Sequence, residues 1–377
     1  MENRTPLKPT SKRRINGEVR LGLVLLFLTL FELILLVVLV VQAFQPTKQP
    51  VEPNQPGDST LDNVQNSDPP TEQPVFSGAV LSTLPYQTER TQLISMELAS
   101  RYAVLVDCTT GEIVASLRAS ERFSPASMTK VMTLIVACEQ LSEEDLNRQL
   151  TLTQEITDYV TSGEYLGMEL SLINGDLYLN DRFYIRDLLY GIGMASAADC
   201  TYMVCREISG SEEAFVELMN QKCREMGLTD THFDNIIGYE SENNYTTARD
   251  MAAIMMYAMQ SDLIADILGR TSYYSFEGYY TENGVEKHYS RGYNSTLQSR
   301  KNSYRTHFGV DFELQTARLL GGKTGYLESN GIKNQCLVLH ASSKSDGDKY
   351  VLVVGGSEEL QYYTMKDIKS ILDFYIQ

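Results

Sequence analysis

The stretch Phe123-Ser-Pro-Ala-Ser-Met-Thr-Lys-Val-Met-Thr133 places a serine hydroxyl and a lysine amine three residues apart at the start of a predicted helix. Ser127 begins a run to Gln140 in which apolar residues recur at helical spacing, and serine is favoured at helix N-termini. Positions i and i+3 share a helix face, so the Lys130 amine can reach the Ser127 oxygen. A serine needs a neighbouring base to become a strong nucleophile, and a lysine serves as one when desolvation or a nearby cation lowers its pKa. The pair is a candidate nucleophile and base, although alone it is equally a helix cap and a solvated lysine.

The N-terminal part of the chain predicts a membrane anchor. Residues 1–20 carry six basic and two acidic residues, and residues 21–44 are predominantly apolar, with the single charge of Glu32. About 20 apolar residues cross a bilayer, and a basic flank stays in the cytoplasm. We therefore expect a cytoplasmic tail (1–20), one transmembrane helix (21–44) in the lipid bilayer of the cell membrane, and an extracellular remainder. A cleaved signal peptide is the competing interpretation, although its apolar region is usually shorter.

Residues 45–84 predict a disordered linker, because they are rich in polar residues and hold seven of the eleven prolines of the chain. Such a composition cannot bury a core. We expect the folded domain to occupy residues 85–377.

Within this domain, the ends of the chain predict strands and the middle predicts helices. Residues 101–107 and 112–117 read as two strands around a turn at Gly111, and residues 334–341 and 349–355 read as a second pair. Between them, helical patterns cover residues 127–140, 185–208, 211–226 and 247–268, and a further helix closes the chain at 365–377. The fold class is therefore α+β: an antiparallel sheet built from N- and C-terminal strands, with an inserted helical lobe.

Composition excludes several functions. The net charge of −17 argues against nucleic-acid binding, which requires a basic surface. The four histidines lie far apart and the six cysteines have no Cys-x-x-Cys spacing, so we expect no metal and no cofactor. Most cysteines lie in apolar or helical contexts, where a buried free thiol is the commonest state.

A second motif, Leu320-Gly-Gly-Lys-Thr-Gly-Tyr326, directly precedes the terminal strand pair. Lys323 and Thr324 are expected on a strand edge, and Gly325 is expected to let a ligand approach the backbone. Alone, the motif fits a glycine-rich turn with a surface lysine. Ser-x-x-Lys followed by Lys-Thr-Gly is, however, part of the motif set of penicillin-binding proteins and serine β-lactamases.

The chain resembles the low-molecular-mass penicillin-binding proteins that act as serine-type D-Ala-D-Ala carboxypeptidases (peptidase family S11). The resemblance runs from about residue 90 to the end. The segments that carry it, in the order of the family, are residues 125–133, 188–191, 213–220, 226–233, 245–251 and 322–325.

The resemblance implies a reaction on the D-Ala-D-Ala end of peptidoglycan stem peptides. Ser127 would attack the penultimate carbonyl, Lys130 would be its base, and Lys323 with Thr324 would receive the terminal carboxylate. The backbone N–H groups of Ser127 and of the strand near Tyr326 would form the oxyanion hole. β-Lactams would acylate the same serine as covalent inhibitors.

The middle element departs from the family pattern. Where Ser-x-Asn is usual, residues 194–200 place Ser196 correctly but Ala198 at the asparagine position. Ser196 can still relay a proton. Asp199 lies one step along the predicted helix, which turns its side chain about 100° away.

Two alternatives stay open on these residues. The missing asparagine favours a catalytically weak or inactive homologue that binds cell wall or a partner protein. A β-lactamase is less favoured, because Glu143-Glu-Asp-Leu-Asn147 matches the deacylating motif of one β-lactamase class but comes too early in the chain.

The long segment 280–317 before the Lys-Thr-Gly motif is either part of a cleft wall or a surface insertion.

Overall fold

A computed structural model describes residues 73–161, 179–329 and 332–376. The predicted tail, transmembrane helix and most of the linker lie outside these residues. No single helix in the described ranges has the length and hydropathy needed to cross a membrane. One sharply bent helix pair, Ala248–Ala258 with Asp262–Gly269, passes by length and composition alone.

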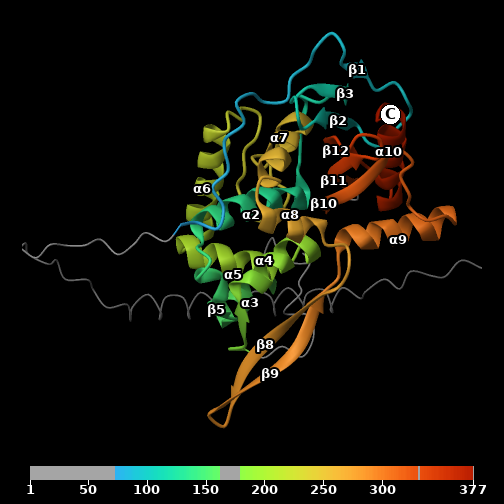
Figure 1. Cartoon of the computed structure of the whole chain (residues 1–377). Helices are drawn as coiled ribbons and strands as arrows, with labels where there is room; N and C mark the ends of the chain where they lie inside the picture. Colours follow the sequence, from blue (N-terminus) through green and yellow to red (C-terminus); the bar gives the residue numbers. More distant parts are fainter. Residues whose placement is uncertain (1–72, 162–178, 330–331, 377) are drawn as a thin grey trace, which may run out of the picture. The chain divides into compact units, whose positions relative to one another are not determined.

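A six-stranded sheet forms the centre of the fold (Figure 1). Its order joins the two ends of the domain, as predicted: β1 (Gln92–Leu93), β3 (Ile113–Leu117), β2 (Tyr102–Asp107), β12 (Lys349–Ser357), β11 (Ile332–Ser343) and β10 (Ala317–Ser329). Neighbouring strands are antiparallel except for β1 and β3. The Lys-Thr-Gly motif lies on β10, one of the two edge strands of this sheet.

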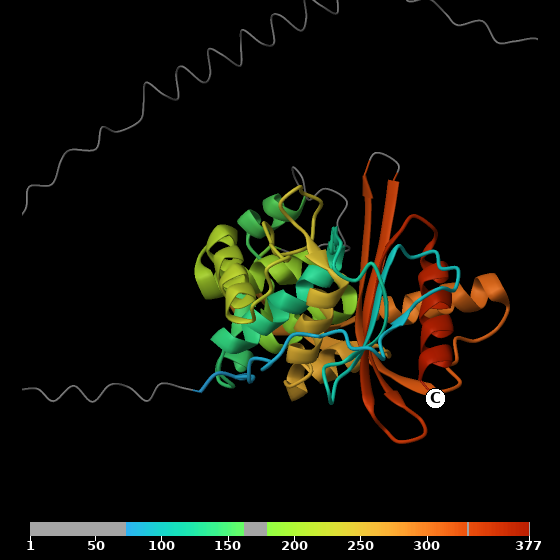
Figure 2. The same ribbon diagram turned by 90° about the horizontal axis from the view of Figure 1, so that it is seen from above.

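The sheet is buried on both faces, and its central strands are apolar at successive positions, as such burial requires. Along β12, Val351 and Val353 pack into the core of the helical lobe, whereas Leu352 and Val354 pack toward α9 (Thr296–Phe308) and α10 (Gln361–Tyr375). Figure 2 shows the sheet edge-on between these two layers. The continuous apolar runs in the sequence follow from this arrangement.

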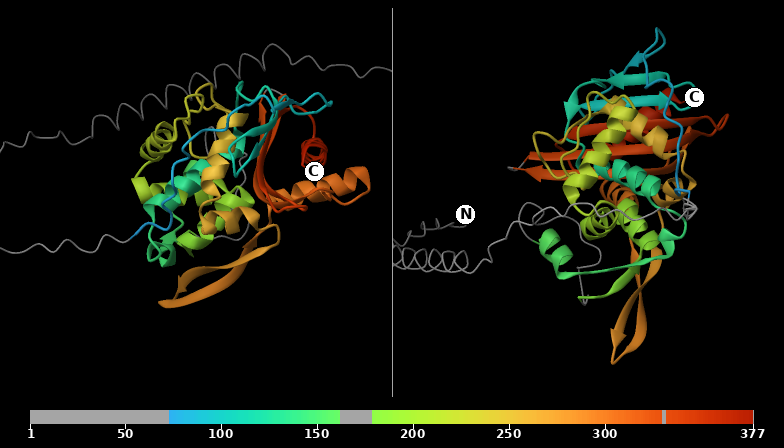
Figure 3. Two further views of the ribbon diagram at one scale, coloured as in Figure 1. Left: turned by 45° about the horizontal axis from the view of Figure 1, so that its top comes forward. Right: turned by 90° about the vertical axis from the view of Figure 1, so that its left-hand side faces the viewer.

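The helical lobe surrounds α2 (Thr129–Gln140), whose first ten residues are all buried. A helix that is buried all round is a core helix. The other elements of the lobe are η2 (Asp145–Asn147), α3 (Gln154–Thr161), α4 (Ile185–Tyr190), η4 (Gly191–Ala195), α5 (Ala198–Ser209), α6 (Glu212–Glu225), α7 (Ala248–Ala258) and α8 (Asp262–Gly269). Figure 3 shows this lobe against one face of the sheet.

Two helices predicted as continuous are broken. The pattern over residues 185–208 is divided into α4, the π-helical η4 and α5, and the chain turns at Ser196, whose φ is +61°. Close packing accompanies the break: a side chain on Gly193 would meet Ile267 at 2.2 Å. The pattern over 247–268 is divided where the Ser261 side chain caps α8. Helical periodicity continued across both breaks and hid them.

Two smaller sheets complete the fold. β4 (Arg122–Phe123) pairs with β7 (Thr246–Thr247). The other sheet has the order β5 (Gln149–Thr151), β6 (Arg182–Tyr184), β8 (Tyr274–Glu282) and β9 (Val285–Tyr293), with each strand paired to the next. The β8–β9 hairpin projects from the domain (Figure 1) and turns at Asn283-Gly284, where both residues have positive φ. An Asn-Gly pair favours this turn.

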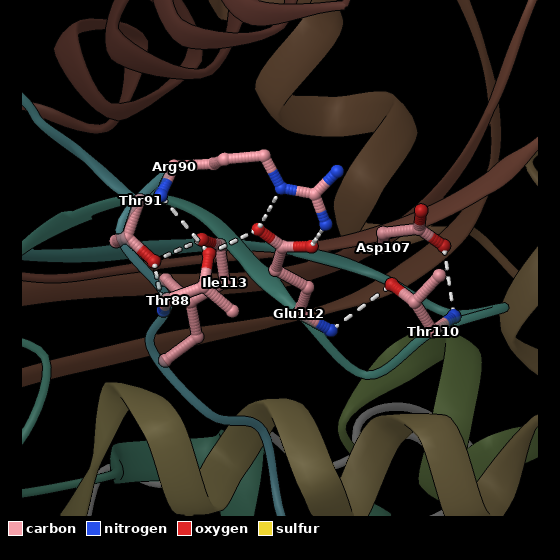
Figure 4. A network of polar contacts seen from close by, with 7 residues as sticks. All are labelled: Thr88, Arg90, Thr91, Asp107, Thr110, Glu112 and Ile113. Carbon is pink, nitrogen blue, oxygen red and sulfur yellow. Dashed lines mark hydrogen bonds and ion pairs between the residues drawn. The ribbon is translucent and has the colours of Figure 1, made fainter.

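The folded part begins earlier than composition indicated. Residues 74–79, assigned by sequence to the linker, lie on the helical lobe: the backbone N–H groups of Val75 and Phe76 donate to carbonyls at the C-terminal end of α2. The Phe76 ring is buried and packs edge-on against Tyr257. Further along, Arg90 pairs with Glu112 beside the β2–β3 turn (Figure 4).

Candidate active site

The predicted nucleophile and base are adjacent. Ser127 lies in the short 3-10 helix η1 (Ala126–Met128), and Lys130 lies in the first turn of α2. The Lys130 Nζ atom donates to Ser127 Oγ over 3.1 Å and to the Ile237 carbonyl over 2.7 Å. The lysine side chain is fully buried, so it is not the solvated helix lysine of the alternative interpretation.

The Ile237 carbonyl is held by Asn235, a residue that sequence reasoning missed. The Asn235 Oδ1 atom accepts from the backbone N–H groups of Ile237, Gly238 and Tyr239 at 3.3, 2.7 and 2.9 Å. Gly238 has a φ of +84°, and a Cβ there would lie 1.8 Å from the Ala126 carbonyl oxygen. The loop therefore fits tightly against η1, with its carbonyl directed at Lys130. The nearest sequence signal was the match over residues 226–233, which ends two residues earlier.

Ser196 and Lys323 meet although 127 residues separate them. The Lys323 Nζ atom donates to Ser196 Oγ over 2.9 Å and to the Thr324 carbonyl over 2.8 Å. The left-handed conformation of Ser196 places it at the turn between η4 and α5 rather than within a helix. Both side chains are buried.

Gly325 lies at a close contact between β10 and the chain that leads into η1. A Cβ on Gly325 would lie 2.3 Å from Cys336 Sγ, 3.0 Å from the Pro125 carbonyl oxygen and 3.1 Å from the Ala126 Cβ. The glycine thus lets β10 approach the chain that leads into η1. Burial raises the pKa of the Cys336 thiol to about 12, so the thiol stays protonated and donates to the Pro125 carbonyl over 3.1 Å. These contacts fix Ser127 against the sheet.

One cavity of about 450 Å³ joins these elements. Ser127, Ser196, Thr324 and Tyr326 line it, while Lys130 and Lys323 reach it through their hydrogen bonds to the two serines. The remaining lining residues are Thr296, Ser299, Arg300, Glu328, Lys333, Gln335, Leu360 and Gln361. The cavity therefore gathers the predicted site residues from three separate parts of the chain.

Helix α9 supplies a wall that the motifs did not identify. Thr324 donates to Thr296 over 2.8 Å. The buried Arg300 donates to the Gly325 carbonyl over 2.7 Å and to Gln335 over 3.0 Å. Both interpretations of segment 280–317 thus hold in part: α9 forms a cavity wall, and the β8–β9 hairpin is a projecting insertion.

Neither Ala198 nor the residue after it brings a side chain to the cavity in place of the usual asparagine. Ala198 is fully buried at the first residue of α5 and is not among the residues that line the cavity. Asp199 is also buried and outside the lining, and its carboxylate accepts from the Cys200 N–H over 2.8 Å. Glu143, the β-lactamase-like residue, pairs with Arg186 over 3.0 Å, and its side chain is 72% exposed. It lies outside the cavity lining.

Solved structures show the same fold. The Streptomyces K15 DD-transpeptidase aligns with a TM-score of 0.60 and 23% identity, over 74% of this chain and 98% of its own. Penicillin-binding protein 5 from Haemophilus influenzae aligns with a TM-score of 0.54 and 23% identity, over 74% of this chain and 70% of its own. The fold is that of the penicillin-binding transpeptidases.

Sequence comparison then identifies the family. Residues 87–358 match the model of the D-alanyl-D-alanine carboxypeptidase family, peptidase S11, and the chain belongs to it. The D-alanyl-D-alanine carboxypeptidase DacF of Bacillus subtilis is 30% identical over 271 residues, which are 71% of this chain and 60% of the relative. DacA of Escherichia coli K12 is 29% identical over 193 residues, 49% of this chain and 43% of the relative. The chain thus spans about 60% or less of the length of these relatives.

Proposed function

We propose that this protein is a serine D-alanyl-D-alanine carboxypeptidase that removes the terminal D-alanine from peptidoglycan stem peptides. The observation that carries the proposal is the 3.1 Å contact between Lys130 Nζ and Ser127 Oγ, with the lysine excluded from water. Family membership supplies the substrate class. Thr324 lines the same cavity and follows Lys323 on β10, a pair that suits a carboxylate.

Acylation begins when Ser127 Oγ attacks the carbonyl of the penultimate D-alanine and Lys130 takes the serine proton. The backbone N–H groups of Ser127 and of β10 near Tyr326 stabilise the oxyanion, where one such donor is worth about 2.7–4 kcal/mol in other enzymes. Ser196, which lines the cavity and accepts a hydrogen bond from Lys323, passes a proton to the departing amine of D-alanine.

Positive charge orients the substrate. Lys323 and Thr324 receive the terminal carboxylate, and the buried Arg300 guanidinium adds to the potential beside Thr324. Two cations in a partly enclosed cavity act more strongly on an anion than they would in water. Water then hydrolyses the acyl-enzyme, whereas a β-lactam leaves Ser127 acylated.

We further propose that the domain acts outside the cell, held at the membrane by residues 21–44. Cell fractionation tests this placement. The full chain is expected in the membrane fraction and accessible to external protease, and deletion of residues 21–44 is expected to release it. Full protection of the domain in intact cells would contradict the orientation.

Release of D-alanine from diacetyl-L-Lys-D-Ala-D-Ala by the full chain in detergent tests the activity. Wild-type protein is expected to release D-alanine, and Ser127→Ala is expected to release none. Acylation of Ser127 by penicillin without any D-alanine release would instead support the second candidate, a weak or inactive homologue that binds cell wall. The buried Ala198, which offers no amide to the cavity, favours that candidate.

The Ala198→Asn variant separates the two candidates further. If the absent amide limits turnover, the variant releases D-alanine about tenfold faster, equivalent to about 1.4 kcal/mol of barrier. We expect this gain. An unchanged rate in a variant with an unchanged melting temperature would show that Ala198 is not the limiting feature.

A further inference from the structure

Side chains on one face of β10 line the cavity beyond the nucleophile Ser127. Thr324, Tyr326 and Glu328 all line the cavity, and they alternate along the strand because successive side chains point to opposite faces. On β11, Lys333 lies opposite Glu328, and Gln335 lies opposite Tyr326. These two residues line the cavity as well. The cavity therefore extends along both strands at least as far as Glu328 and Lys333.

The end of the cavity carries one negative and one positive side chain. Glu328 and Lys333 are directly opposite in the ladder, yet within the described residues no ion pair of 4 Å or less joins them. The Glu328 carboxylate instead accepts a hydrogen bond from the Tyr326 hydroxyl, with 2.5 Å between the two oxygens. This bond holds the carboxylate on the cavity side of β10, and Lys333, opposite on β11 and also in the cavity lining, is a separate charge.

The spacing fits an extended peptide. β10 is an edge strand, and an extended peptide can bind along such an edge. With the terminal carboxylate near Thr324, the residue two positions earlier lies about 7 Å farther along the strand, close to Tyr326. A side chain of four or five bonds from that residue reaches Glu328 and Lys333.

We propose that Glu328 and Lys333 form a subsite for a zwitterionic side chain on the third residue of the stem peptide. A diamino diacid such as meso-diaminopimelate ends in both an ammonium, which Glu328 binds, and a carboxylate, which Lys333 binds. A lysine at the same position offers only the ammonium. The inference rests on the proposed function, because it assumes a D-alanyl-D-alanine peptide in the cavity.

Peptide binding to the full-length Ser127→Ala chain in detergent tests the subsite without turnover. Three pentapeptides are compared by calorimetry, L-Ala-γ-D-Glu-X-D-Ala-D-Ala with X as meso-diaminopimelate, its side-chain amide or L-lysine. The diaminopimelate peptide is expected to bind about fivefold tighter than the other two, the upper range for one partly exposed charge pair. Equal dissociation constants for all three would overturn the subsite.

Variants test which group of the peptide side chain each of the two charged residues binds. In the Ser127→Ala background, Lys333→Gln is expected to abolish the fivefold preference for the diaminopimelate peptide. Glu328→Gln is expected to weaken the binding of all three peptides to the same extent. Lys349→Gln, an exposed lysine elsewhere on the sheet, is the matched control and should leave the preference intact. A loss of preference in this control equal to that in Lys333→Gln would overturn the assignment.

Failure of the subsite and failure of the proposed function give different results. The predicted preference in Ser127→Ala, combined with no D-alanine release by wild type, supports the subsite and rejects the catalytic activity. D-Alanine release by wild type without any preference rejects the subsite alone. No binding of any peptide rejects both.

Discussion

Asn235 determines where the Ile237 carbonyl meets the Lys130 amine, since its side chain accepts three consecutive backbone N–H groups. We expect Asn235→Ala to slow acylation of Ser127 by fluorescent penicillin at least about tenfold, because a displaced base costs rate steeply. The measurement is the acylation rate constant at a temperature where the variant is folded.

Asn220 provides a matched control for this variant. It is also a buried asparagine, and it bonds both backbone groups of Phe233. Asn220→Ala should lose a comparable amount of stability, about 1–3 kcal/mol for unsatisfied buried groups, but should keep the wild-type acylation rate. Equal slowing in both variants would mean that Asn235 acts through stability alone.

Single residues also mark the limit of sequence reasoning at this site. Ser127 and Lys130 were predictable because helical backbone, here η1 leading directly into α2, fixes the separation of residues three positions apart. Ser196 was found only through the order of motifs, since its periodic surroundings indicated a continuous helix. Asn235 was not found, because a side chain that binds neighbouring backbone groups leaves no spacing signature.

At the scale of elements, β10 can pack closely against the chain entering η1 because Gly325 has no side chain. The Gly325→Ala methyl would press on Cys336 and on the chain entering η1, so we expect acylation to slow about tenfold or more. Adding Cys336→Ala removes the nearest contact and should restore part of the rate. A Gly325→Ala variant with wild-type acylation would show that this packing does not position Ser127.

The buried His340 on β11 leads us to predict that the free energy of unfolding depends on pH. Burial, with a smaller contribution from Lys349, lowers the pKa of His340 from 6.5 to about 4. Between these values the unfolded chain binds a proton that the folded chain does not, so the free energy of unfolding falls as the pH drops from about 6.5 to about 4.

His340→Gln should therefore reduce the loss of melting temperature between pH 7 and pH 4.5. The matched control is His288→Gln on the exposed β8–β9 hairpin, where the side chain is 66% exposed and its pairing with Glu277 contributes little. If His340→Gln lost as much melting temperature as wild type over this range, His340 would not be the responsible group.

For the whole molecule, the union of N- and C-terminal strands in one sheet could be predicted, because apolar runs at both ends of the domain need one another to be buried. The helix breaks at Ser196 and Ser261 could not, because helical periodicity continues across both of them. Segment 280–317 had no periodic signal that separated α9, a cavity wall, from the projecting hairpin. The early start of the fold at residues 74–79 was hidden by a polar, proline-rich composition.

The central claim is that Ser127 is an activated nucleophile in this cavity. The most direct measurement is to incubate the full chain with a fluorescent penicillin and to locate the adduct by peptide mass analysis. We predict one adduct, on the peptide that contains Ser127, and none in Ser127→Ala. No adduct on wild type, or an adduct that persists in Ser127→Ala, would contradict the account.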